Sequence, residues 1–186
     1  MMKLPFFPII DGSYGGNQAW FTHPREQGDG CGVVAAANLY FYYRDRKQVT
    51  KHHFLSVAED FYKELRPLHF YNPFSKVNSY GLPFFSLTMK RIGKKLQRPV
   101  QIYRGKNEVL AKAFIKKNIL RAQPVILLII MNKNIGHFSN HYVTITSFRE
   151  DEEFILGFSS WGTYYERPLR VLLEGSLFFR LGAFYE

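Results

Sequence analysis

The sequence contains a single cysteine among its 186 residues. One cysteine cannot form a disulfide within the chain, and an odd thiol is unusual in a secreted protein unless it reacts or pairs between chains, so we expect a reducing compartment. A second cysteine that could ligate zinc is missing, and the six histidines include no spaced pair set beside carboxylates. The sequence therefore predicts no metal and no cofactor.

Long hydrophobic runs are missing as well. The longest run, Pro124–Met131, is much shorter than the about 20 apolar residues that a membrane-spanning helix needs. Near the N-terminus, the apolar stretch Leu4–Ile10 is short and is broken by Pro5 and Pro8, which is not typical of a secretory signal. We therefore expect a soluble, cytoplasmic protein without a membrane span.

Acidic residues are few, because 15 Asp and Glu stand against 25 Lys and Arg and the net charge is +10. Such a balance is compatible with a polyanionic partner, a membrane surface or an acidic substrate. The basic residues are spread over stretches that we expect to be exposed helix faces, and no known nucleic-acid-binding motif accompanies them. These stretches are 44–51, 90–98 and 112–121. The pattern argues against a nucleic-acid partner and favours a solvated basic surface.

The length fits one domain, 1–186, with a sizeable core. The segment Met1–Gly30 is rich in Gly, Pro and Asn and predicts an extended, loop-like entry. Cys31 then opens a run that is apolar on every helical face, which indicates a helix in the middle of the protein. Thr50 is expected to cap the helix after it. The expected helices are 32–43, 52–65, 82–96 and 109–120, with a short strand at 100–103.

The C-terminal half changes character and becomes rich in β-branched and aromatic residues. Helices followed by antiparallel strands predict an α+β fold. We expect a helical lobe at about 31–121 and a β lobe at about 122–186. The expected strands are 125–131, 141–148, 154–158, 164–173 and 177–185.

Cys31 is the first candidate for chemistry. The stretch Gln27-Gly28-Asp29-Gly30-Cys31-Gly32 leads directly into the buried helix, so the sulfur is expected at a helix N-terminus. There the unpaired N–H groups and the helix dipole favour a thiolate, which is the attacking form. A lone cysteine is more often a small buried hydrophobe. The flanking glycines favour the reactive interpretation, because they let a substrate backbone approach closely.

A nucleophilic thiol needs a general base, and His141 is the candidate. It begins an alternating strand, so its side chain is expected on one defined face of a sheet. His137, in an Asn- and Gly-containing loop, is the alternative. Taken alone, a histidine at a strand start is more often structural than catalytic.

A third group is expected to orient the imidazole by accepting its N–H. Either Ser159 or Ser160, at the end of the next strand, can lie across a hairpin from His141. The pattern does not decide between them, because the turn at Arg149–Glu153 can hold three or four residues. A shift of one residue in the pairing turns every side chain to the other face.

An oxyanion would be stabilised by the backbone N–H of Cys31 and one side-chain donor upstream. Gln27 is the closer glutamine in the sequence. Gln18 lies in a more distinctive stretch of Gly, Asn and aromatic residues. Both stay candidates on the residues alone.

The order of these motifs resembles the papain-like cysteine peptidases, especially the bacterial bacteriocin-processing (double-glycine) branch. A glutamine precedes Cys31-Gly32, His141-Tyr142-Val143 follows on a strand, and Ser159-Ser160-Trp161-Gly162 comes next. The family commonly has Asn-Ser-Trp-Gly at the last motif, so the resemblance puts Ser159 in the place of the orienting Asn. An inserted loop at Thr22–Asp29 would bring Gln18 into the place of the family's glutamine.

The resemblance implies a papain-like fold with a cleft between the lobes, a peptide or protein substrate, and Cys31, His141 and Ser159 as catalytic residues. A serine carries no charge to stabilise imidazolium, so the Cys–His ion pair is expected to be weaker than in the family. The implied reaction is hydrolysis of an amide or peptide bond through a thioester. The same site can instead pass the acyl group to an amine, or the fold can bind peptides without turnover.

Overall fold

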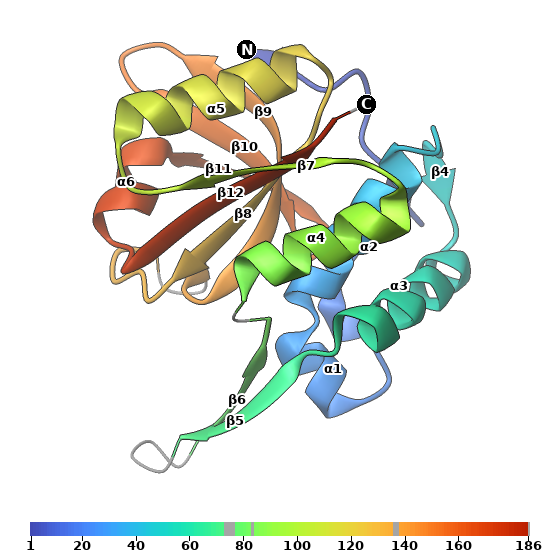
Figure 1. Ribbon diagram of the computed structural model, residues 1–186. Coiled ribbons are helices and arrows are strands. Elements are labelled where there is room, and N and C mark those ends of the chain that lie inside the picture. The colour runs from blue at the N-terminus through green and yellow to red at the C-terminus, as the bar shows by residue number, and fades with distance from the viewer. Residues whose placement is uncertain (73–76, 83, 136–137, 186) are drawn as a thin grey trace.

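The computed structural model describes residues 1–72, 77–82, 84–135 and 138–185. Its centre is a seven-stranded antiparallel sheet with helices on both faces, which confirms the predicted α+β class (Figure 1). The strand order is β11-β10-β9-β8-β12-β7, and β1 extends the sheet beside β9. The strands are β1 Met2–Lys3, β7 Val100–Arg104, β8 Val125–Ile130, β9 His141–Glu150, β10 Phe154–Ser160, β11 Thr163–Pro168 and β12 Phe178–Phe184.

One face of the sheet is covered by α2 Cys31–Tyr42 and α4 Phe85–Leu96 (Figure 1). The helix α3 Lys51–Leu65 packs on the outer side of these two helices. The other face carries α5 Glu108–Leu120 and α6 Leu169–Glu174. The sheet therefore separates two hydrophobic cores, one on each side. Within the described residues, no helix is both long enough and apolar enough to cross a membrane.

The helix α2 is buried as its sequence predicts. It contacts α3 on one side and β9 on the other. Three successive alanines, 35–37, lie at its middle and are almost inaccessible to solvent. Because alanine adds little bulk and has the best helix propensity, this stretch allows the close approach of both neighbours. The predicted cap of α3 is also present, since Thr50 Oγ1 accepts a hydrogen bond from the backbone N–H of His53 at 3.2 Å.

The N-terminal segment is more structured than the sequence predicts. It contains β2 Ile9–Ile10, β3 Ser13–Tyr14, the 3-10 helix η1 Gln18–Trp20 and α1 Pro24–Asp29. The strand β2 also pairs with β4, Gln48–Val49, beyond the end of α2. The segment is thus tied to the body of the molecule along its length.

Two further regions differ from the sequence prediction. The strand expected at 164–173 ends at Pro168, and α6 follows, because Leu169, Leu172 and Leu173 form a buried helical stripe. A stretch expected as loop contains the hairpin of β5 Leu68–Asn72 and β6 Val77–Gly81.

Residue 121, where the sequence predicts the boundary between a helical lobe and a β lobe, does not separate helices from strands in the structure. The strand β7 lies before it and belongs to the large sheet, where it pairs with β12. The helix α5 also lies before it and packs on β1, β8 and β9.

Candidate active site

Cys31 is the first residue of α2, at the position that the sequence predicts. Burial raises the pKa of its thiol to about 11, and the nearby carboxylate of Asp29 adds to this increase. Hydrogen bonds from the backbone N–H groups of Tyr142 and Gly32 act in the opposite direction, as expected for a sulfur at a helix start. Burial is the larger effect, so the pKa of the half-buried thiol lies above its ordinary value instead of below it.

His141 is the first residue of β9 and is almost completely buried. Its Nε2 shares a hydrogen bond of 2.7 Å with Ser160 Oγ. The indole ring of Trp161 stacks on the imidazole, with ring centres 4.3 Å apart and planes 20° apart. Burial lowers the pKa of His141 to about 4. The ring is thus fixed on two sides and neutral at physiological pH.

The partner of His141 is Ser160, whereas the resemblance puts Ser159 in this role. Ser159 points elsewhere, and its Oγ donates a hydrogen bond of 2.7 Å to the backbone carbonyl of Tyr14. The physical cause is a bulge between β9 and β10. Gly157 pairs with Ser147, but Phe158 pairs with Ile145 and passes over Thr146.

This shift of one residue exchanges the faces of the two serines. Beyond the bulge, Ser159 pairs with Thr144, so Ser160 lies on the same face as Val143 and His141. In an unshifted register, Ser159 would lie opposite Ile145 and therefore on the face of His141. The register that the sequence leaves open is thus what decides which serine contacts the imidazole.

The turn after β10 places Trp161 over His141. Trp161 and Gly162 both have positive φ, 48° and 73°, and connect Ser160 to its partner Thr163 in a two-residue hairpin turn. The N-terminal segment holds this turn, because Asn17 Nδ2 donates to the carbonyl of Trp161 at 3.0 Å. The tryptophan therefore belongs to the candidate site.

Gly15 allows the N-terminal segment to pass close to β10. Its φ is +78°, and a Cβ built there would lie 2.6 Å from Ser159 Oγ. Next to it, the backbone N–H of Gly16 donates to Asn38 Oδ1 at 2.9 Å. Through these contacts the segment is fixed against both α2 and the sheet.

The two glutamines occupy different places. Gln18 lines the cleft that contains Cys31, and its Nε2 donates to the backbone carbonyl of Gln27 at 2.7 Å. Its amide carries a second N–H. The side chain of Gln27 instead donates to the carbonyl of Phe21 at 2.7 Å. Of the two, Gln18 is the one positioned to face a substrate at Cys31.

A narrow cleft brings most of the candidate residues together. Its central space is about 10 Å³, roughly the room of one water molecule. A substrate must therefore lie over its mouth or widen it. The candidate residues that line it are Gln18, Cys31, His141, Ser159, Ser160 and Trp161. His137, the alternative base, lies outside the described residues.

Two polar residues of the cleft were missed in the sequence. Asn38 lies two helical turns after Cys31 and is buried. An amide in an otherwise apolar helix is a signal that was available in the sequence. Thr144 is also buried, and its Oγ1 has no hydrogen-bond partner among the described residues. This hydroxyl remains available to a group that enters the cleft.

An apolar groove of about 790 Å³ lies at the start of α4. Tyr142, which lines the cleft and whose backbone N–H bonds the sulfur of Cys31, neighbours two residues of this groove. The ring of Phe85 stacks on Tyr142 with centres 6.0 Å apart, and Leu128 is its partner across the sheet. Other residues that line the groove are Phe84, Leu87, Ile130 and Phe178, together with Arg104 and Arg180.

The described part of the chain contains no group of three or more His, Cys, Asp or Glu that could hold a metal ion. The chemistry available at the cleft is that of a thiol, a neutral imidazole, hydroxyls and N–H donors. In comparisons with known proteins, no family model matches the chain and no curated protein matches it.

Proposed function

We propose that the protein is a papain-like thiol hydrolase that cleaves amide or peptide bonds through a thioester on Cys31. The observation that carries this proposal is the shared cleft of Cys31, at the start of a buried helix, and His141, whose ring is fixed by Ser160 and Trp161. A nucleophile, a base and a group that orients the base are the parts that such chemistry requires.

The hydrogen bond to Ser160 is compatible with the tautomer that this chemistry needs. When Nε2–H donates to Ser160 Oγ, the lone pair of Nδ1 is left to accept the thiol proton of Cys31. The sulfur then attacks the substrate carbonyl carbon, and the carbonyl π electrons move to its oxygen. The backbone N–H of Cys31 and the amide of Gln18 donate to this oxyanion.

The second half of the reaction returns the proton. The C–N bond breaks, and Nδ1–H of His141 protonates the leaving amine, which leaves a thioester on Cys31. His141 then removes a proton from water as the water oxygen attacks the thioester carbonyl carbon. The C–S bond breaks, the carboxylic acid leaves, and His141 returns the proton to the sulfur, which regenerates the thiol. No charge is left in the cleft at the end of either half.

The resting pair is neutral, because burial raises the pKa of Cys31 to about 11 and lowers that of His141 to about 4. Proton transfer therefore has to accompany substrate attack instead of preceding it. The developing oxyanion and its donors supply the compensating charge. This predicts a slower enzyme than one with a preformed ion pair.

The apolar groove favours substrates with apolar side chains near the cleaved bond. Its aromatic and aliphatic walls would bury such side chains, with about 25 cal/mol gained for each Å² of apolar surface removed from water. Arg104 and Arg180 add a preference for an acidic residue in the same segment. A peptide that alternates apolar and acidic residues is the substrate class that fits.

Acylation of the folded protein by p-nitrophenyl acetate tests the proposal. We expect intact-protein mass spectrometry to detect one acetyl group on wild type and none on Cys31→Ser. We expect acylation of His141→Gln to be slower by at least about 100-fold, which is the lower range for loss of a general base. Equal rates in wild type and His141→Gln would contradict the proposed base.

Two further measurements distinguish a hydrolase from an acyltransferase. Release of acetate without an added amine indicates a hydrolase, whereas acetyl transfer to added glycinamide indicates an acyltransferase. Thermal unfolding of each variant, followed by circular dichroism, serves as the folding control.

A peptide-binding module without turnover is the second candidate, favoured by the raised pKa of the Cys31 thiol and the narrow cleft. It predicts that folded wild type resists acetylation, while a phage-displayed peptide library enriches binders on Cys31→Ala. Leu87→Glu, an exposed position in the groove, is expected to abolish that enrichment. Acetylation of Cys31 that depends on His141 would exclude this candidate.

A further inference from the structure

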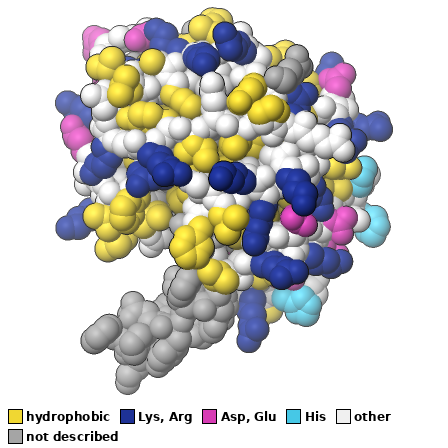
Figure 2. Space-filling view, in the orientation of Figure 1, with side chains coloured by type: hydrophobic (Ala, Val, Ile, Leu, Met, Phe, Trp, Pro, Cys, Tyr) yellow, Lys and Arg dark blue, Asp and Glu magenta, His cyan; other side chains and the backbone are white. Residues whose placement is uncertain are grey.

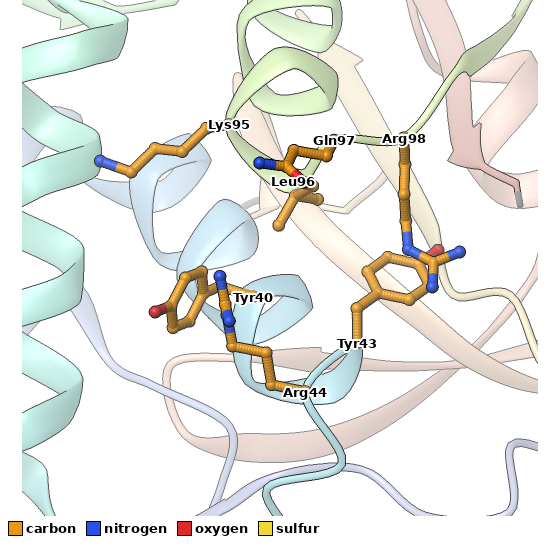
Figure 3. A pocket seen from close by; sticks show the side chains of 7 residues that line it. All are labelled: Tyr40, Tyr43, Arg44, Lys95, Leu96, Gln97 and Arg98. Carbon is orange, nitrogen blue, oxygen red and sulfur yellow. The ribbon is translucent and has the colours of Figure 1, made fainter.

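A second pocket lies at the other end of α2, between the C-terminal ends of α2 and α4 (Figure 3). Its volume is about 420 Å³, within the range of small-molecule sites in proteins. Tyr40, Tyr43 and Arg44 come from the end of α2. The residues from the end of α4 and the loop after it are Lys95, Leu96, Gln97 and Arg98.

The pocket is strongly cationic. Arg44, Lys95 and Arg98 line it, and none of its described lining residues carries a carboxylate. Among the described residues, neither Arg44 nor Lys95 forms an ion pair. Figure 2 shows that Lys and Arg side chains also form a band on the neighbouring surface over α4. An anion near this pocket therefore meets positive charge from several directions.

Aromatic rings fix the cations in place. The guanidinium of Arg44 lies over the ring of Tyr40 at 4.3 Å, and that of Arg98 lies over Tyr43 at 4.2 Å (Figure 3). The ammonium of Lys95 lies 4.8 Å from the ring centre of Phe61. Stacking on a ring uses the face of a guanidinium, and its N–H donors lie in the plane, where they match the oxygens of a phosphate.

Cations at helix C-termini also have a simpler role, since they complement the helix dipole. That role needs only a charge near the last turn, and it does not require a hollow. In this protein the charges surround a pocket that is much larger than a single ion, with the amide of Gln97 at its rim. A phosphate carries up to two negative charges, so several cations stabilise its binding more than they stabilise the binding of a carboxylate.

We propose that this pocket binds a phosphorylated small molecule, with its phosphate held by Arg44 and Lys95 and its organic part beside Tyr40. The site is separate from the cleft at Cys31, because the two lie at opposite ends of α2. The proposal does not depend on the proposed hydrolase activity.

The test is a titration with AMP, inorganic phosphate and adenosine, followed by amide chemical shifts in ¹H–¹⁵N NMR spectra. We expect AMP to bind saturably, phosphate more weakly and adenosine not at all, with shifts confined to residues 40–44 and 95–98. The binding of AMP should weaken as salt is raised, because the contacts are ionic and exposed.

The variant for this test is Arg44→Gln with Lys95→Gln, which we expect to weaken AMP binding about tenfold or more. The matched control is Lys117→Gln with Arg121→Gln, which removes two charges from the C-terminal end of α5. It should leave AMP binding unchanged. Adenosine binding as tight as AMP, no saturable binding of either phosphate probe, or equal losses in the control would overturn the proposal.

Discussion

The two ends of α2 have opposite environments. At its N-terminal end, Cys31 lies in a cleft of about 10 Å³ and burial favours the neutral thiol. At its C-terminal end, Arg44 lies exposed beside a cationic pocket of about 420 Å³. The helix dipole favours negative charge at the first end and positive charge at the second. Only the second end follows this preference, because desolvation outweighs the dipole at the first.

Introducing a carboxylate at each end gives the sharpest test of this difference. We expect Cys31→Asp to lower the free energy of unfolding by on the order of 2 kcal/mol relative to Cys31→Ser, because a charge is forced into a half-buried site beside the carboxylate of Asp29. Gln97→Glu, at the C-cap of α4, adds the same charge to the open pocket at the C-terminal end of α2, where we expect a change within about 0.5 kcal/mol. Urea denaturation at pH 7 measures both.

Equal losses for Cys31→Asp and Gln97→Glu would show that the cleft is open to water. Desolvation could then no longer account for the raised pKa of Cys31. The neutral variant Cys31→Ser separates the loss of the thiol from the gain of the charge.

The pH dependence of stability tests the burial of His141, in the cleft at the N-terminal end of α2, without an added charge. Burial lowers the pKa of His141 from 6.5 to about 4, so in acid the unfolded state binds this proton before the folded state does. The stability that the neutral histidine contributes is present above pH 6.5 and is lost as pH falls toward 4. The slope is about 1.4 kcal/mol for each pH unit, or about 3 kcal/mol in all.

Urea denaturation between pH 7 and pH 4 checks this loss, with His141→Gln as the comparison. We expect the stability difference between wild type and variant to shrink by about 3 kcal/mol over this range. A constant difference would mean that His141 titrates in the folded protein like an exposed histidine.

Much of the fold follows from local patterns in the sequence. The all-round apolar run after Cys31 and the alternation after His141 act within one element, and both elements begin where the sequence predicts. The switch from strand to helix at Pro168 was missed, because Leu169–Leu173 fits either element until its packing partners are known. Of the short strands near the N-terminus, β1 and β2 pair with distant segments, β9 and β4. The pairing of β2 with β3 is local, and its signal, the turn at Asp11-Gly12, was missed.

The candidate site was predicted less completely, since its details depend on long-range contacts. The sequence identifies Cys31 and His141 by residue type and position. The sequence alone does not show the burial that shifts the pKa values of these two residues. It also does not show that Trp161 stacks on His141, because this stacking depends on a turn held by Asn17. These properties arise only when separate segments meet.

The bulge between β9 and β10 provides the last and smallest test, because it sets adjacent serines on opposite faces. Each serine makes one buried or part-buried hydrogen bond, so we expect Ser160→Ala and Ser159→Ala to lose a similar stability of about 1 kcal/mol. Their effects on chemistry should differ. Only Ser160 holds His141, so acetylation of Cys31 by p-nitrophenyl acetate should slow about tenfold in Ser160→Ala and stay unchanged in Ser159→Ala.

Ser160→Thr is the conservative variant, because it keeps a hydroxyl at the same place and should restore part of the rate. A larger loss of rate in Ser159→Ala than in Ser160→Ala would mean that the register beyond Gly157 is the unshifted one. In that case Ser159 would occupy the place of the family's Asn after all, and the motif Ser159-Ser160-Trp161-Gly162 would align with the papain-like pattern position by position.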